Sequence, residues 1–132
     1  MTHGLDHIAS AVTDLEKAIE TYTRLFGVTV HARENLAERN LEVAFLKVGN
    51  VMVELISPTS EASTVDDFLK KRGEGVHHLA FKTGHVEDAV ETLKGRSFRL
   101  VQVPAKGAHG RTVAFLHPRD CHGVLIELVG EP

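Results

Sequence analysis

The second half of this 132-residue sequence repeats the first half, and the repeat constrains the fold more than any other feature. Three pairs of segments match: Asp6-His7-Ile8-Ala9 with His77-His78-Leu79-Ala80, Val43-Ala44-Phe45-Leu46 with Val113-Ala114-Phe115-Leu116, and Val53-Glu54-Leu55-Ile56 with Ile126-Glu127-Leu128-Val129. His7 and His78 stand 71 residues apart, and the match of Glu54 to Glu127 needs only a small insertion in the second copy. This period is longer than that of the common solenoid repeats. The sequence therefore predicts two homologous halves.

Each half is predicted to contain one strand, one helix and three further strands, in that order. In the first half, the residue pattern predicts strands near 7–12, 28–33, 41–48 and 51–56, with a helix after the first strand. In the second half, it predicts strands near 76–81, 99–103, 111–116 and 123–129, with a helix over 86–94. A further helix is expected over 64–71. We therefore predict an α+β fold with two tandem βαβββ modules in one domain, residues 1–132: module 1 over about 3–57, a bridge over 58–75 and module 2 over 76–132.

The first helix has clear signals at both ends. Thr13 or Asp14 is expected to cap its N-terminus, and Gly27 is expected to end it. Apolar side chains at helical spacing form one stripe that is expected to face the core: Leu15, Ala18, Ile19, Tyr22, Leu25 and Phe26. Gly49-Asn50 is expected to join two strands in a tight hairpin.

Composition excludes several classes of protein. The net charge of −3 argues against nucleic acid as the main partner, because phosphate binding requires a basic surface. No apolar run approaches the roughly 20 residues that span a bilayer, and the N-terminal residues lack the pattern of a secretory signal, so a cytoplasmic protein is expected. The single cysteine, Cys121, has no cysteine partner for an internal disulfide and is expected to be structural.

Four repeated residues are the candidate ligands of a metal ion. Strand side chains alternate between faces, so His7 shares a face with Ala9, and His78 shares one with Ala80. Glu54 and Glu127 likewise lie within apolar strands. Burying an isolated carboxylate costs several kcal/mol, so such a group is usually paired, protonated or bound to a metal.

A shared cation accounts for both carboxylates at once. Two neutral imidazoles and two carboxylates around a divalent ion form a neutral cluster, and this mixed nitrogen and oxygen set suits Co, Mn, Ni or Zn better than Ca. An internal duplication produces such a quartet if the duplicated positions converge on one axis. A duplication could also preserve the same letters without function, and the spacing alone leaves both interpretations open.

The whole chain resembles the metalloenzymes of the vicinal oxygen chelate superfamily and, within it, the methylmalonyl-CoA epimerase family. The resemblance is carried by Asp6-His7-Ile8-Ala9, Val53-Glu54-Leu55-Ile56-Ser57-Pro58, Ser63-Thr64-Val65 with Phe68-Leu69, and two longer segments, 73–81 and 115–128. The most specific segments are the His-His segment at 77–78 and the Phe-Leu-His-Pro segment at 115–118. The resemblance implies a glyoxalase-type fold in which both modules form one cupped mixed sheet around a metal site.

The resemblance also implies ligands and a reaction. It assigns the metal to His7, Glu54, His78 and Glu127, and it implies an acyl-CoA substrate whose two epimers are interconverted by removal and return of a proton at C2. Because an epimerase needs proton carriers on two faces of one carbon, Glu54 and Glu127 are the catalytic candidates as well as ligands. The family also implies a homodimer.

Several alternatives stay open at this stage. A glyoxalase I-type lactoylglutathione lyase has the same ligand set, and a non-enzymatic drug-binding protein has the same fold, although such a protein needs no metal quartet. Some epimerases carry a catalytic Glu that aligns with Val43, so the neighbouring Glu42 is expected to be a solvent-facing charge. The segment 106–111 is basic and is a weak candidate for contact with the phosphates of coenzyme A.

Overall fold

The structure is a computed structural model that describes residues 2–131, and the chain divides into two compact units. We call His7–His77 the first unit, and residues 2–6 together with 78–131 the second unit. The predicted α+β class and the order of one strand, one helix and three strands in each half are confirmed. The predicted module boundaries, and the assignment of both modules to one domain, stay predictions.

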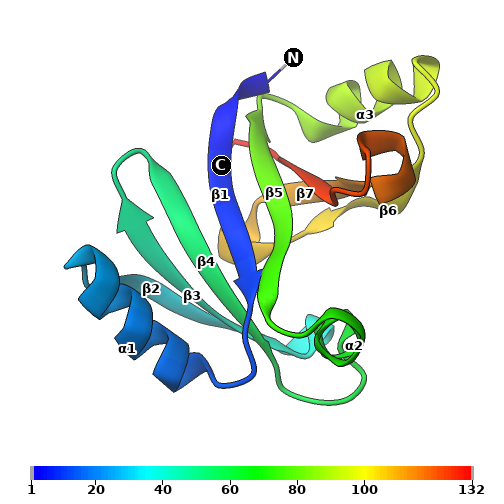
Figure 1. Cartoon of the computed structure of the whole chain (residues 1–132). Helices are drawn as coiled ribbons and strands as arrows, with labels where there is room; N and C mark the ends of the chain where they lie inside the picture. The colour runs from blue at the N-terminus through cyan, green and yellow to red at the C-terminus, as the bar shows by residue number, and fades with distance from the viewer. Residues whose placement is uncertain (1, 132) are drawn as a thin grey trace. The chain divides into compact units, whose positions relative to one another are not determined.

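The first unit is a sheet with two helices. Its elements are β1 (Thr2–Ala11), of which the residues from His7 onward belong to this unit, α1 (Leu15–Phe26), β2 (Val30–Leu36), the 3-10 turn η1 (Ala37–Arg39), β3 (Leu41–Val48), β4 (Val51–Pro58) and α2 (Thr64–Arg72) (Figure 1). The strand order is β2-β3-β4-β1. β3 is antiparallel to both of its neighbours, whereas β4 is parallel to β1. The module therefore places its first and last strands side by side.

Local signals in the sequence explain the ends of α1. The side chain of Asp14 accepts a hydrogen bond from the Lys17 backbone N–H at 3.1 Å, which caps the first turn. Gly27 ends the helix with a φ of 66°, a left-handed conformation that glycine adopts without strain. Leu55 and Leu46 belong to the buried cluster beneath this helix. The sequence signals at both ends of the helix are therefore confirmed.

The apolar stripe of α1 was predicted two residues too long. Leu15, Ala18, Ile19 and Tyr22 pack on the core of the first unit, but Leu25 and Phe26 are exposed. The reason is that Val28 and Val30, which follow the helix, complete the buried cluster in place of its last turn. Phe26 packs instead on the ring of Tyr22, with the ring centroids 5.9 Å apart.

The second unit has the same architecture. Its elements are residues 2–6 of β1, β5 (Gly75–Thr83) from His78 onward, α3 (Val86–Gly95), β6 (Leu100–Lys106), η2 (Ala108–Gly110), β7 (Thr112–Leu116), η3 (Pro118–Cys121) and β8 (Ile126–Val129) (Figure 1). The strands that follow β1 run in the order β5-β8-β7-β6. β8 is parallel to β5 and antiparallel to β7. α3 packs its buried residues against Ala114 and Leu128 of this sheet.

Several predicted strands differ in their ends. β1 begins at Thr2 rather than near residue 7, and β6 continues to Lys106 rather than ending near residue 103. β8 begins at Ile126 rather than near residue 123, because η3 and the positive φ angles of His122 and Gly123 turn the chain just before it. β2 begins at Val30 and continues to Leu36, beyond the predicted end near residue 33. Within the described residues, no helix is long and apolar enough to cross a membrane.

Candidate active site

The first unit brings together two of the four predicted ligands, His7 and Glu54. In the parallel pairing of β1 with β4, His7 aligns with Met52, and Ala9 aligns with Glu54. Because side chains two residues apart share a face, His7 and Glu54 lie diagonally on one face. His7 Nε2 lies 3.2 Å from Glu54 Oε2. The imidazole and the carboxylate are therefore in direct contact.

The second unit repeats this arrangement in the same register. Ala80 of β5 aligns with Glu127 of β8, so the glutamate again lies opposite the alanine that follows the histidine by two residues. His78 Nε2 lies 3.1 Å from Glu127 Oε1. Two independent parallel strand pairs thus hold the same two side chains in the same contact.

Both pairs lie in apolar surroundings. The four candidate ligands are only 5–7% exposed: His7, Glu54, His78 and Glu127. Ala9 and Ala80, which align with the two glutamates, are fully buried. Phe45 aligns with Glu54 and Phe115 aligns with Glu127 on the antiparallel side. The predicted burial of the four candidates is confirmed.

An edge-on aromatic contact fixes the ring of His78. Its centroid lies 5.4 Å from that of Phe115, and the two ring planes are 89° apart. Phe115 is itself buried and lies beside Ala80 in one apolar cluster. The ring is therefore packed on one side and faces Glu127 on the other.

The geometry and donor set of each pair fit a transition-metal cation. Ligand atoms about 2.0–2.2 Å from one ion lie about 3.0 Å apart at a right angle and about 3.4 Å apart at the tetrahedral angle. The two observed separations, 3.2 and 3.1 Å, fall within this range. Each pair offers one imidazole nitrogen and carboxylate oxygen, which are donors that Mn, Co, Ni and Zn accept. The residues present therefore fit a divalent metal.

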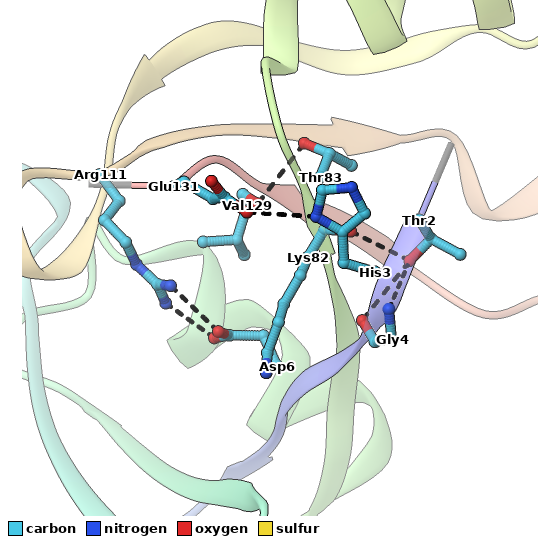
Figure 2. A network of polar contacts seen from close by, with 9 residues as sticks. All are labelled: Thr2, His3, Gly4, Asp6, Lys82, Thr83, Arg111, Val129 and Glu131. Atoms are coloured by element: carbon cyan, nitrogen blue, oxygen red, sulfur yellow. Dashed lines mark hydrogen bonds and ion pairs between the residues drawn. The ribbon is translucent and has the colours of Figure 1, made fainter.

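The residues that precede the two histidines differ. Asp6 precedes His7 and accepts two hydrogen bonds from the guanidinium of Arg111, at 3.0 and 2.7 Å (Figure 2). His77 precedes His78, and its ring packs edge-on against Phe68, with centroids 4.9 Å apart. The repeat is therefore retained at the candidate ligands and lost at the residue that precedes each histidine.

The expectation for Glu42 is corrected, and the expectation for the basic segment 106–111 stays a prediction. Glu42 is half-buried rather than solvent-facing, because it lies on the central strand β3 between Asn35 of β2 and Ser57 of β4. In the basic segment 106–111, the guanidinium of Arg111 is bound to Asp6 and is thus already engaged by a carboxylate. Contact of the rest of the segment with coenzyme A phosphates stays a prediction.

The residues of the η3 turn have structural contacts. His117 accepts a hydrogen bond from the Arg119 backbone N–H at 3.1 Å and caps the turn. Asp120 binds the backbone N–H and the guanidinium of Arg99, at 2.8 to 3.1 Å. Burial raises the pKa of the Cys121 thiol, with a smaller contribution from Asp120, and this disfavours the reactive thiolate. These contacts agree with a structural role for Cys121.

Sequence reasoning missed the two arginine–aspartate pairs. Asp6 and Arg111 are separated by 105 residues, and Arg99 and Asp120 by 21. A charged residue inside an apolar segment, such as Asp6 beside His7, was the one available sign that a partner exists.

Known proteins are similar to this chain in sequence and in fold. The family model of the Glyoxalase/Bleomycin resistance protein/Dioxygenase superfamily matches residues 6–115. The mitochondrial methylmalonyl-CoA epimerase of Bos taurus is 42% identical over 94% of this chain and 72% of its own length. The ethylmalonyl-CoA/methylmalonyl-CoA epimerase of Cereibacter sphaeroides is 36% identical over 97% of this chain and 98% of its own length.

A solved structure agrees with the sequence matches. The Streptomyces coelicolor methylmalonyl-CoA epimerase, in complex with 2-nitronate-propionyl-CoA, superposes with a TM-score of 0.94 at 37% identity, over 99% of this chain and 96% of that one. The fold is thus that of a glyoxalase-superfamily protein. Within that superfamily, the chain belongs to the methylmalonyl-CoA epimerase family, and the predicted family resemblance is confirmed.

Proposed function

We propose that this chain interconverts the (R) and (S) epimers of methylmalonyl-CoA, with one divalent cation held by His7, Glu54, His78 and Glu127. The observation that carries the proposal is the doubled pair: two buried glutamates, each in contact with a buried histidine, in the same strand register. Sequence identity to the epimerases over almost the whole chain supports the substrate class.

Charge and donor number favour one shared ion over two separate ones. Each pair offers one nitrogen and one carboxylate. These are two donors, whereas a transition-metal ion binds at least four. Two pairs together supply four donors and two negative charges, which match one divalent cation. When bound, the cation would supply positive charge beside the thioester oxygen, where negative charge develops as C2 loses its proton.

The glutamates are assigned to the proton as well as to the cation. One carboxylate removes the proton from C2 on one face, and the other, protonated, returns a proton to C2 on the opposite face. Their equivalence in the repeat supports this division, because epimerisation requires similar chemistry on both faces. The apolar surroundings exclude water and strengthen the interaction of each carboxylate with the reacting carbon.

An assay in deuterated buffer tests the reaction. Racemic methylmalonyl-CoA is expected to gain deuterium at C2 and either pure epimer to become a mixture, when the full chain carries Co²⁺. Methylglyoxal with glutathione is the parallel substrate, because a lactoylglutathione lyase has the same ligand set. Turnover of the second substrate alone overturns the epimerase assignment. Ethylmalonyl-CoA, named for the Cereibacter sphaeroides relative, is the further substrate with which to test the acyl group.

Metal stoichiometry tests the site. After dialysis against a chelator, Co²⁺ is expected to bind with one ion per chain and to restore the activity. Two ions per chain contradict a shared site, and activity without added metal contradicts a metal requirement. The expected homodimer and the cytoplasmic location stay predictions, which sedimentation analysis and cell fractionation respectively test.

A further inference from the structure

The ion pair of Asp6 and Arg111 lies in the second unit and has near-ideal geometry. Two nitrogens of the guanidinium each donate to a different carboxylate oxygen, at 3.0 and 2.7 Å (Figure 2). The side chain of Asp6 is 10% exposed and that of Arg111 is 22% exposed. Two-point arginine–carboxylate pairs fix orientation as well as distance, and partial burial shields this pair from solvent. The pair is therefore a rigid connection.

This connection begins one residue before a proposed ligand. Asp6 and His7 are consecutive in β1, so their side chains point to opposite faces of the strand. Asp6 therefore acts on His7 through the backbone rather than by contact. At the other end, Arg111 immediately precedes β7, and Phe115 of β7 aligns with Glu127.

Other contacts hold the same stretch of β1. The Thr2 hydroxyl donates to the Lys82 carbonyl at 3.0 Å, and His3 Nδ1 lies 3.2 Å from Glu131 Oε1 (Figure 2). These contacts are exposed and lie four or more residues before His7. The Asp6–Arg111 pair is nearer to His7 and more buried, and thus constrains its backbone more strongly.

The Asp6–Arg111 pair has no equivalent in the other half of the repeat. The residue equivalent to Asp6 in the other half is His77, and the residue equivalent to Arg111 is Leu41, which carries no charge. The ligand positions are duplicated, whereas the ion pair is specific to one half. A feature of this kind is not explained by the need to build a βαβββ module, because the first unit builds one without it.

We propose that Asp6 and Arg111 are positioning residues of the metal site: the pair fixes the backbone of β1 so that His7 is held where it binds the cation. The proposal rests on the proposed function only for the assignment of His7 as a ligand. Metal sites require their ligands to be placed within about 0.5 Å. Residues that orient a ligand typically change metal affinity 10- to 100-fold when they are mutated.

Titration of the metal-free full chain with Co²⁺, followed by visible absorbance, tests the proposal. Asp6→Asn removes the charge from the pair and is expected to weaken Co²⁺ binding about 10-fold or more. Arg111→Lys keeps the charge but loses the two-point geometry, and it is expected to weaken binding by a smaller factor. Arg111→Lys decides the question if Asp6→Asn does not fold.

The matched control is Asp120→Asn. It removes the carboxylate from the other two-point arginine pair of the same unit, Arg99–Asp120. Urea unfolding of the metal-free variants measures what each substitution costs the fold. Asp120→Asn is expected to leave Co²⁺ affinity within about 2-fold of wild type, whatever its stability, because orienting effects on a metal are local to its ligands.

Each outcome decides the proposal. Wild-type affinity in Asp6→Asn and Arg111→Lys overturns it, and so does an equal loss of affinity in Asp120→Asn, because the effect then follows stability alone. A wild-type chain that binds Co²⁺ but does not epimerise methylmalonyl-CoA overturns the proposed function and leaves the positioning role intact. A wild-type chain that binds no Co²⁺ overturns both.

Discussion

In the first half of the chain, the histidine that contacts Glu54 follows an aspartate held by an arginine. In the second half, the histidine that contacts Glu127 follows another histidine, which packs against a phenylalanine. The strand register around the two contacts is the same, and the glutamate lies opposite an alanine each time. The halves thus agree at the two His–Glu contacts and differ at the residue that precedes each histidine.

This difference separates the residues that we assign to the reaction, which both halves share, from a neighbouring position that has changed between the halves. Alternation along a strand allows one face to change while the other is preserved. The preserved face carries the imidazoles and carboxylates that we assign to the cation and the proton. On the other face, the position before the histidine carries Asp6 in one half and His77 in the other, so each of these two residues serves one half only.

The largest expected effect comes from removing one proton carrier at a time. Glu54→Gln and Glu127→Gln keep the size and one oxygen of each side chain but remove its basicity. Each is expected to lower the epimerisation rate by about 10² to 10⁴-fold. The measurement is deuterium exchange at C2 from each pure epimer, with metal content checked in every sample.

The same experiment sharpens the comparison of the halves. If the two glutamates act on opposite faces, each variant should still exchange deuterium into one epimer while failing to convert it. Undiminished epimerisation in either variant, with metal bound, removes that glutamate from the list of proton carriers and makes the two halves chemically unequal.

The next effect concerns the cores of the two halves. Leu55 and Leu128 are equivalent in the repeat, and both are buried against a helix, beside α1 and α3 respectively. Leu55→Ala and Leu128→Ala are each expected to lower the free energy of unfolding by about 2–5 kcal/mol. Leu55→Ala is expected to cost more, because its cluster has more apolar members.

Urea unfolding followed by circular dichroism measures both costs. Hydrogen exchange at the amides of β3 and β7 then shows whether each substitution loosens its own unit or both units equally. A loss below about 1 kcal/mol at either position contradicts the assignment of these leucines as core residues.

A smaller effect distinguishes the starts of the two helices. Asp14 caps α1 through its side chain, whereas His85, at the same place before α3, makes no such hydrogen bond. Asp14→Ala is expected to cost about 1 kcal/mol of unfolding free energy, and His85→Ala less than about 0.5 kcal/mol. Thermal unfolding of the two variants side by side measures the difference, and equal shifts contradict it.

The smallest effect is on acid stability. Hydrogen bonds from Arg99 lower the pKa of Asp120 from its ordinary value of 3.8 to about 2. Because the carboxylate is more acidic in the folded state, it stabilises the fold above about pH 4, and this contribution is lost as the pH falls toward 2. The first half has Thr29 at the position of Arg99, because Val30 and Leu100 pair with the equivalent Leu46 and Leu116, and it has no such charge there.

Unfolding measured between pH 5 and pH 2 tests this effect. Asp120→Asn is expected to be less stable than wild type at neutral pH and to lose less of its stability on acidification. Parallel pH profiles for the two proteins contradict the lowered pKa. The effect is expected to be small, because the pair lies at the surface.

The repeat and the alternation of strand residues were enough to predict the order of strands and helices in each half and the burial of the four candidate ligands, whereas the glyoxalase-type fold was predicted from the family resemblance. A repeated His and Glu within apolar strands can be placed from local pattern alone, because strand faces follow from sequence parity. The pairing of Asp6 with Arg111 was beyond this reasoning, since two side chains 105 residues apart meet only through the tertiary fold. The exposure of Leu25 and Phe26 was missed for a related reason: the core beneath α1 is completed by residues of another element.

The parallel pairing of the first and last strands of each module has a consequence for the folding kinetics. Contacts between residues far apart in sequence form late, because a long loop must close first. Ala9 meets Glu54, and Ala80 meets Glu127, only when the last strand of the module joins the first. The candidate ligands of each unit are then expected to come together late in folding, so a metal bound to them is expected to slow unfolding while leaving the folding rate unchanged.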